Sequence, residues 1–187
     1  MDDRQVRGAF TQLAYKFVET HYEPAVRDKI IASMDPAVVA SIPKLSDTGW
    51  YPLEHFVSIC DAIAKNRTLD QTEDEVRRLG QSIAEAALGT FLKLILKILT
   101  PALFANKYDS FWKRYHNFGG MHCDVTEIES NHIILYYPVY PWVHLIGPGW
   151  AETTFKAMGK PNVSTFTDLP RGLREASVKE LATHVRW

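Results

Sequence analysis

Over the first two thirds of the chain, hydrophobic residues recur every three or four positions, which is the spacing of amphipathic helices. The segment from Asp2 to His21 carries such a series at Val6, Phe10, Leu13, Phe17 and Val18. A second, shorter helix is predicted after Pro24, with its apolar residues at Val26, Ile30 and Ile31. Asp35 and Pro36 then have the pattern of an N-cap followed by proline at the first helical position, which predicts a further short helix.

The middle of the chain predicts one half-buried helix and one very long helix. The first begins after Trp50-Tyr51-Pro52, and its apolar face is formed by Leu53, Phe56, Val57, Cys60 and Ile63. Thr72 and Glu75 have the spacing of a capping box, in which the two side chains satisfy free backbone N–H groups at a helix start. An apolar series continues from there to Ile98, so this helix would be about 40 Å long.

A helix rich in aromatic residues follows. Thr100 and Pro101 repeat the cap-plus-proline pattern, and Gly119-Gly120 ends this helix. From Met121 onwards apolar and polar residues alternate, which predicts a hairpin of strands at 121–127 and 133–140. A helix over residues 147–162 and two more strands, 163–168 and 178–187, complete the predicted elements.

Together these elements predict an α+β fold with an N-terminal helical layer packed on an antiparallel sheet of four to five strands. We expect a single domain over residues 1–187, with a mainly helical part at 1–118 and a sheet with one inserted helix at 119–187. At 187 residues, the chain is long enough to bury a core of its own.

Composition narrows the function without identifying it. Apolar residues make up 46% of the chain and charged residues 23%, and the formal net charge is −1, as is typical of a soluble globular protein. Basic residues are scattered, which argues against nucleic acid as a partner. The most apolar run, Ile83–Leu99, is interrupted by Glu85, Lys93 and Lys97, so we expect a buried helix and no membrane span. The polar N-terminal sequence and the presence of only two cysteines favour the cytoplasm.

Five short segments carry a resemblance to one group of proteins. They are Gly8 with Phe10, residues 50–53, Leu79-Gly80, residues 111–115 before a Gly-Gly turn, and the final Val185-Arg186-Trp187. In these segments the chain resembles the superfamily of 4-vinyl-reductase-like domains, haem-NO-binding sensor domains and TRAPP trafficking subunits. It is most similar to the small bacterial haem-NO-binding-like proteins. The resemblance implies helices on a four- or five-stranded sheet, often around an apolar ligand, in a sensor or an adaptor.

The chain departs from the haem-binding members in two places. Those members use a histidine on a central helix and a Tyr-x-Ser-x-Arg motif for the haem propionates. The corresponding helix here, Ile95–Tyr115, contains no histidine, and the motif does not occur in the chain. We therefore predict no cofactor, with haem disfavoured. In TRAPP-type subunits a cysteine facing a tunnel can carry an acyl chain, and Cys60 is the residue here that could take that part.

The spacing of the histidines and cysteines does not favour a metal site or a catalytic site. His122 and Cys123 are adjacent on a strand and therefore point to opposite faces, so they cannot share a metal ion. His116 and His132 lie in or near predicted turns, where exposed histidines are common. We predict no metal site.

A cysteine nucleophile would need a histidine base beside its thiol. His55 and Cys60 are five residues apart on one helix and do not face each other. We therefore expect no catalytic residues and a protein that is not an enzyme.

The aromatic residues are the remaining candidates for a functional site. Residues that could line a pocket between the long helix and the sheet are Trp50, Tyr51, Cys60, Phe91, Ile95, Phe104, Trp112, Tyr115, Tyr136, Tyr140 and Trp150. We interpret the chain as a bacterial sensor domain that binds a small apolar or lipid-like molecule and signals to a partner, as a homodimer. The alternative is a dimeric protein-interaction adaptor with a solid core, similar to the TRAPP subunits. The two interpretations differ in whether apolar volume is left unfilled behind Trp112 and Phe91.

Overall fold

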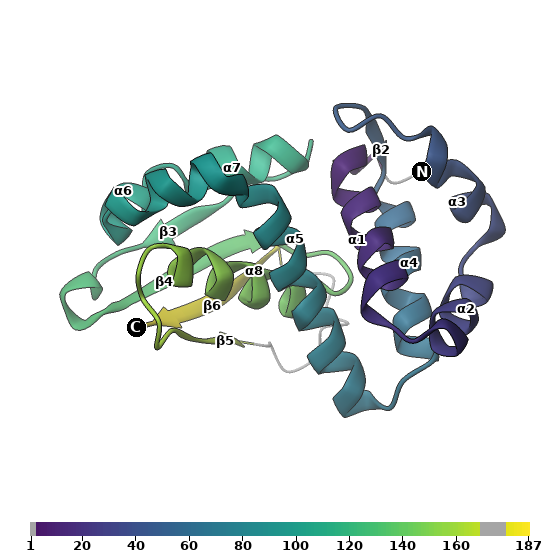
Figure 1. The fold of residues 1–187 in the computed structure, drawn as a ribbon. Helices are drawn as coiled ribbons and strands as arrows, with labels where there is room; N and C mark the ends of the chain where they lie inside the picture. Colours follow the sequence, from purple (N-terminus) through teal and green to yellow (C-terminus); the bar gives the residue numbers. More distant parts are fainter. Residues whose placement is uncertain (1–2, 169–178) are drawn as a thin grey trace.

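The computed structural model describes residues 3–168 and 179–187, apart from the side chains of residues 90–94. A helical N-terminal part lies beside an antiparallel sheet that is covered by helices (Figure 1). The predicted α+β fold is therefore confirmed, and the main sheet has four strands.

The N-terminal part combines a small two-stranded sheet with a group of helices. Its elements are β1 (Gln5–Arg7), α1 (Gly8–His21), α2 (Pro24–Ser33), α3 (Pro36–Ser41), the 3-10 helix η1 (Ile42–Lys44), β2 (Trp50–Pro52) and α4 (Leu53–Lys65). The predicted helix over residues 2–21 is wrong at its start, because Val6 lies in β1 and pairs with Tyr51 of β2. Val6 is completely buried there, so a long-range pairing outweighs its helical spacing.

The long helix α5 (Leu69–Ile98) runs between the two parts (Figure 1). It begins earlier than predicted, because the capping box is formed by Thr68 and Gln71. Thr72 instead donates its hydroxyl to the Thr68 carbonyl at 2.8 Å, and Glu75 accepts a hydrogen bond from the Tyr22 hydroxyl at 3.0 Å. Gly89, with φ 48° and ψ 175°, kinks the helix, so α5 is not one straight rod.

The C-terminal part alternates helices with the strands of the main sheet. Its elements are α6 (Pro101–Ala105), α7 (Tyr108–Tyr115), β3 (His122–Asp124), the 3-10 helix η2 (Ile128–Ser130), β4 (His132–Pro138), α8 (Val143–Ala157), β5 (Ser164–Asp168) and β6 (Glu180–Arg186). The single aromatic helix predicted after Thr100 is thus divided into α6 and α7. α8 begins before Gly147, with Trp142 at φ 71° as its N-cap.

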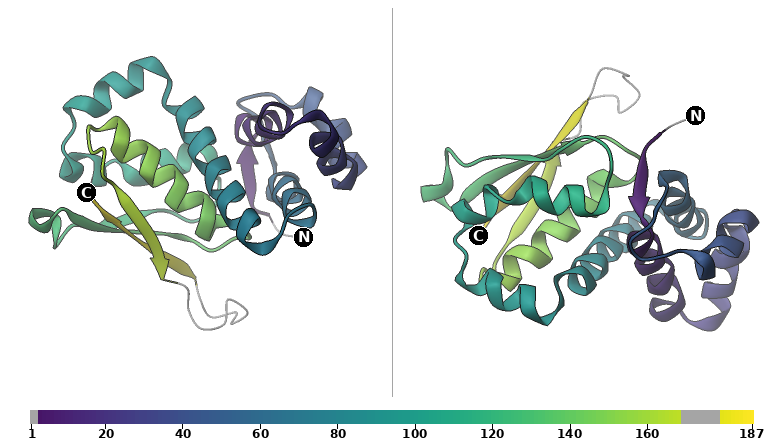
Figure 2. Two further views of the ribbon diagram at one scale, coloured as in Figure 1. Left: turned by 60° about the horizontal axis from the view of Figure 1, so that its bottom comes forward. Right: turned by 90° about the horizontal axis from the view of Figure 1, so that it is seen from above.

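The four strands of the main sheet are antiparallel, in the order β3-β4-β6-β5. Helices α6, α7 and α8 lie on the same side of this sheet (Figure 2). Along β6, Leu181, Thr183 and Val185 are buried, while the residues between them are half-buried. The alternation gives the sheet one face in the core and a second, more open face.

Helices α5 and α8 approach each other closely because each contributes a glycine. A Cβ atom at Gly80 would lie 2.4 Å from the carbonyl oxygen of Ile146, and one at Gly149 would lie 2.2 Å from that of Arg77. Beside this crossing, the buried Glu152 carboxylate binds the Arg77 guanidinium. Burial raises the pKa of Glu152, but the hydrogen bonds and charge of Arg77, together with hydrogen bonds from Gln81 and Thr165, outweigh it and hold that pKa below its ordinary value. The crossing sets the position of the first half of α8.

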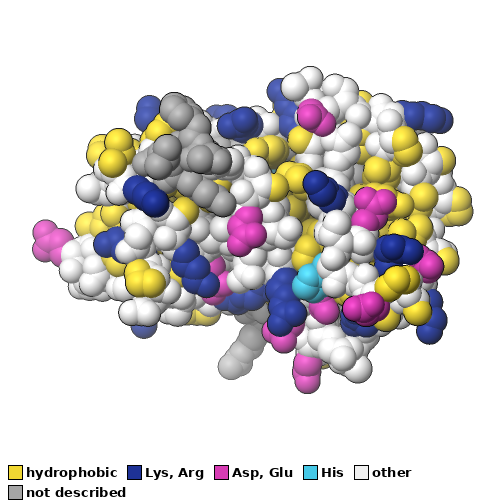
Figure 3. Space-filling view, viewed as in Figure 1, with side chains coloured by type: hydrophobic (Ala, Val, Ile, Leu, Met, Phe, Trp, Pro, Cys, Tyr) yellow, Lys and Arg dark blue, Asp and Glu magenta, His cyan; other side chains and the backbone are white. Residues whose placement is uncertain are grey.

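The surface of the molecule carries charges of both signs. Figure 3 shows basic and acidic side chains interspersed over one face, with apolar side chains between them. Within the described part of the chain, every helix is too short or too polar to cross a bilayer.

Candidate functional site

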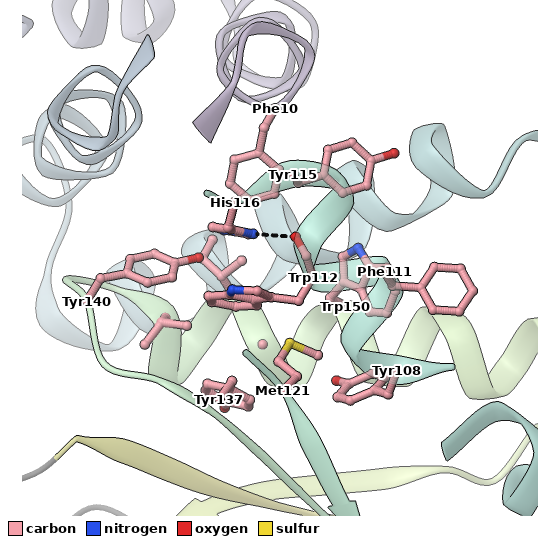
Figure 4. Close-up of a pocket in the computed structure, with 13 residues that line it drawn as sticks. Phe10, Tyr108, Phe111, Trp112, Tyr115, His116, Met121, Tyr137, Tyr140 and Trp150 are labelled. Carbon is pink, nitrogen blue, oxygen red and sulfur yellow. Dashed lines mark hydrogen bonds between the residues drawn. The ribbon is translucent and has the colours of Figure 1, made fainter. Parts of the chain in front are cut away.

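A cavity of about 50 Å³ lies where α1 meets α7, α8 and the sheet (Figure 4). Its lining is almost entirely apolar and aromatic and consists of Phe10, Tyr108, Phe111, Trp112, Tyr115, His116, Met121, Tyr137, Tyr140, Val143, Ile146, Gly147 and Trp150. An engineered cavity of about 150 Å³ holds benzene or xenon. In the form described, the cavity therefore has room for a molecule of only a few atoms.

The backbone after α7 fixes the position of the one histidine in this wall. His116 forms an antiparallel bridge with Val6 of β1. Next to it, the Asn117 N–H donates to the Gln5 carbonyl at 3.1 Å, and the Gln5 N–H donates to the Asn117 side chain at 2.7 Å. This pairing holds His116 at the junction of the N-terminal part with the rest of the molecule.

Aromatic rings enclose the His116 imidazole. It stacks on Trp112, with ring centroids 3.8 Å apart and planes 10° apart, and Phe10 of α1 meets it edge-on at 5.2 Å. The Trp112 indole is itself held in place, because its Nε1–H donates to the carbonyl of Phe118 at 2.7 Å. Figure 4 shows this stack between Phe10 and the remainder of the wall.

One nitrogen of His116 is left without a partner. Nδ1 lies 3.3 Å from the Trp112 carbonyl, and since a carbonyl only accepts, Nδ1 carries the proton. Nε2 is buried and has no hydrogen-bond partner among the described residues, so its lone pair is unused. Burial lowers the pKa of His116 to about 3, although the Trp112 carbonyl opposes this shift. At neutral pH the site therefore presents a neutral imidazole.

Two tyrosine hydroxyls also belong to the cavity. Figure 4 shows the hydroxyl of Tyr140 directed toward the Trp112–His116 stack and that of Tyr108 directed toward Met121. Burial raises the pKa of both phenols, so both remain protonated and can donate hydrogen bonds. The hydroxyl of Tyr115, in contrast, points away from the cavity (Figure 4).

Of the residues proposed from the sequence as pocket lining, four line this cavity together: Trp112, Tyr115, Tyr140 and Trp150. Phe104 is buried nearby, against Tyr108 and Phe155. The Phe91 side chain lies outside the described residues.

The other proposed residues lie elsewhere. Trp50 and Tyr51 are on β2, where the Arg7 guanidinium covers the Trp50 ring and the Tyr51 hydroxyl accepts the Ser46 N–H. Tyr136 stacks on His122 rather than lining the cavity. Ile95 is half-buried on α5. Cys60 is fully buried on α4 within the core of the N-terminal part, and burial raises the pKa of its thiol well above the ordinary value.

Sequence reasoning missed the polar centre of the cavity. His116 was expected in a turn and exposed, but it is 6% exposed. The available signal was its position four residues after Trp112 and two before Phe118, which places an imidazole among aromatic rings. Phe10 carried no such signal, because its contact with His116 joins segments far apart in the chain. Among the described residues, no three or more His, Cys, Asp and Glu side chains are grouped so as to hold a metal ion by themselves.

No family model matches the chain, and no curated protein matches it. Several solved structures share its fold. An H-NOX protein mutant from K. algicida, in the Fe(II) unliganded state, has 18% identity and a TM-score of 0.67, covering 96% of this chain and 95% of that one. An H-NOX protein from S. oneidensis in the Fe(II)NO state has 14% identity and a TM-score of 0.67, covering 96% and 98%. The H-NOX from Shewanella woodyi in the Fe(II)CO state has 14% identity and a TM-score of 0.63, covering 96% and 93%. The chain therefore has the H-NOX fold.

The prediction of no cofactor, with haem disfavoured, is contradicted by these neighbours, whose structures contain Fe(II) in this fold. It relied on the absence of a histidine from the segment Ile95–Tyr115 and on the absence of the Tyr-x-Ser-x-Arg motif. His116 is the residue directly after that segment, and its imidazole lines the cavity.

Proposed function

We propose that this chain is a ligand-binding sensor domain whose ligand occupies the cavity beside His116. The observation that carries the proposal is the unpartnered Nε2 of a neutral, buried imidazole in an otherwise apolar wall. Leaving a buried polar atom without a hydrogen bond costs roughly 1–3 kcal/mol. A ligand that uses the Nε2 lone pair would recover that cost.

Haem is the first candidate ligand, and the H-NOX fold of the solved neighbours supports it. A neutral imidazole nitrogen is a common ligand of haem iron, and the aromatic wall suits the apolar ring. In this assignment His116 would hold the iron, while Trp112 fixes the plane of the imidazole by stacking. The bound iron would supply the position at which a small gas molecule binds.

The residues around His116 fit the binding of iron, whereas the Tyr-x-Ser-x-Arg motif that holds the propionates in the haem-binding members does not occur in the chain. The Nδ1–H donates to the Trp112 carbonyl, and a hydrogen bond of this kind orients a metal-binding imidazole and makes its other nitrogen more basic. The hydroxyls of Tyr108 and Tyr140 offer hydrogen-bond donors to an acceptor inside the cavity. The cavity itself has to widen, because about 50 Å³ is far smaller than a haem group.

A second candidate follows from that volume. A molecule of a few atoms would fit the cavity directly, without any cofactor, and would meet the same imidazole and hydroxyls. An acyl chain would also require the cavity to widen, and unlike haem it has no support from the H-NOX neighbours. In both forms the domain binds its ligand without transforming it, and the unfilled volume beside Trp112 favours a sensor over an adaptor with a solid core. A homodimer stays a prediction.

The test is a titration of the purified protein with ferrous haem, followed by absorption spectroscopy, in the wild type and in His116→Ala. The matched control is His122→Ala, which removes an exposed imidazole on β3. We expect a saturable Soret band in the wild type and the control, and a band that is lost or shifted in His116→Ala.

Xenon under pressure is the probe for the second candidate, followed by the NMR shifts of the residues that line the cavity. Shifts confined to the cavity in a protein that takes up no haem would support direct binding of a small apolar molecule. If neither haem nor xenon binds with saturation, the proposed ligand site is wrong.

A further inference from the structure

A second group of titratable side chains lies on the main sheet, apart from the cavity. The Glu127 carboxylate is 2.6 Å from Nδ1 of His132, and Nε2 of His132 is 3.0 Å from Nδ1 of His184. Nε2 of His184 is in turn 3.0 Å from the Asp168 carboxylate. The four groups form one continuous chain that joins the η2 turn to β4, β6 and the end of β5.

The two imidazoles meet edge to edge. Their nitrogens are 3.0 Å apart while their ring centroids are 5.1 Å apart, and the ring planes differ by only 13°. Two nitrogens that face each other in nearly one plane at this distance form an N–H···N hydrogen bond when one of them carries a proton. The arrangement therefore needs a single proton between the rings.

Counting protons gives the state in which every bond is made. The outer nitrogens, Nδ1 of His132 and Nε2 of His184, face carboxylates, and each must carry a proton to donate. The inner pair needs one more proton, which makes three. Two neutral imidazoles carry only two N–H protons. The complete chain of hydrogen bonds is thus formed when the pair holds one proton more than two neutral rings.

The charges around the pair are mainly negative, which favours an extra positive charge on it. Besides Glu127 and Asp168, the Asp124 carboxylate on β3 interacts electrostatically with His132. A cation close to the pair in the described part of the chain is Arg186 of β6, whose guanidinium lies 5.8 Å from the ring centroid of Phe166. Phe166 in turn stacks on His184 at 4.4 Å and 2°. Among the described residues, three carboxylates and the Arg186 guanidinium therefore lie around the pair.

We propose that Glu127, His132, His184 and Asp168 form a proton-dependent clamp that fastens the η2 turn and the end of β5 to β4 and β6. Loss of the extra proton removes one of the three hydrogen bonds. Addition of a further proton places two N–H groups against each other and two positive charges side by side. The clamp is therefore strongest at intermediate pH and weaker at both higher and lower pH. It does not depend on the function proposed for the cavity.

The test is a double-mutant cycle on thermal unfolding, measured from about pH 4 to about pH 9, across the range in which histidines titrate. The four proteins are the wild type, His132→Gln, His184→Gln and the double variant. Because His116 is present in all four, its own acid sensitivity cancels in the cycle. We expect a coupling worth about 2–4 °C in Tm at intermediate pH that declines toward both ends of the range.

His122→Gln is the control variant, since His122 stacks on Tyr136 of the same sheet but is not part of the clamp. It should leave the wild-type pH dependence of Tm unchanged. A second measurement on the wild type alone, the nitrogen NMR spectrum of the imidazoles, should show three N–H protons shared by His132 and His184 at intermediate pH. A coupling that does not vary with pH, or a spectrum with two N–H protons on the pair, would overturn the proposal.

Discussion

His116 and His132 are buried to nearly the same degree, 6% and 5% exposed, but their polar surroundings are opposite. The His116 ring is enclosed by Trp112, Phe10 and other aromatic side chains, and its Nε2 has no partner among the described residues. Both nitrogens of His132 have partners, a carboxylate on one side and a second imidazole on the other.

The difference teaches that burial alone does not define the role of a histidine. A ring in an apolar wall keeps its neutral form and retains a lone pair that a ligand can use. A ring with a hydrogen-bond partner at each nitrogen leaves no free lone pair for a ligand and links the elements that carry its partners. His116 is an example of the first kind of ring and His132 of the second, so matched substitutions at the two sites can be compared.

The largest expected effect comes from the aromatic partner of each site. Phe10 is 3% exposed and packs on His116 and on Phe56, so Phe10→Ala should lower the free energy of unfolding by about 3–5 kcal/mol. Phe166 is 47% exposed and stacks on His184, so Phe166→Ala should cost less than about 1 kcal/mol. Urea unfolding of the two variants measures the difference. Equal losses would mean that the two surroundings are not as different as the structure indicates.

The next largest expected effect is a loss of folding stability at acid pH that is caused by His116. Free histidine has a pKa of 6.5, and burial lowers that of His116 to about 3, so protons bind the unfolded chain better than the folded one between these values. His116 therefore reduces stability as the pH falls below 6.5, by about 2–3 kcal/mol at about pH 4.5, and by no further amount below the folded pKa.

Urea unfolding of the wild type and of His116→Phe at pH values of about 7 and about 4.5 measures this contribution. Because His116→Phe has no proton to bind at this position, it should lose less stability on acidification than the wild type does. The same loss in both proteins would show that the imidazole is not held neutral by burial.

Local signals in the sequence predicted much of the fold. Asp35 caps α3 through the Ala37 N–H, and Thr100 caps α6 through the Leu103 N–H, as their cap-plus-proline patterns indicated. Alternating residues likewise predicted the β3–β4 hairpin. Some local predictions were wrong, since the capping box of α5 lies at Thr68 and Gln71 rather than at Thr72 and Glu75. A long-range prediction also failed, because Val6 has helical spacing but pairs with Tyr51 of β2.

The two histidine sites also show that contacts between distant segments could not be predicted from the sequence. Trp112 and Tyr140 could be proposed from the local density of aromatic residues, whereas the contact of His116 with Phe10 requires the N-terminal part to be docked. His132 and His184 are 52 residues apart and meet only through the register of β4 against β6. A sequence pattern identifies residue types along one element, and it does not give the register between distant elements.

The smallest expected effect compares the two sites most directly, because the same substitution should stabilise the protein at one site and destabilise it at the other. His116→Phe removes the unpartnered nitrogen and places a larger apolar ring beside the cavity, so it should raise the free energy of unfolding at pH of about 7 by about 1 kcal/mol. His132→Phe leaves the inner nitrogen of His184 without its partner and should lower the free energy of unfolding by about 1–2 kcal/mol. Urea unfolding at a single pH compares the two variants. A loss of stability in both variants would mean that His116 is retained for packing. A gain of stability in His116→Phe together with a loss of ligand binding would mean that the imidazole is kept for the ligand at the expense of stability.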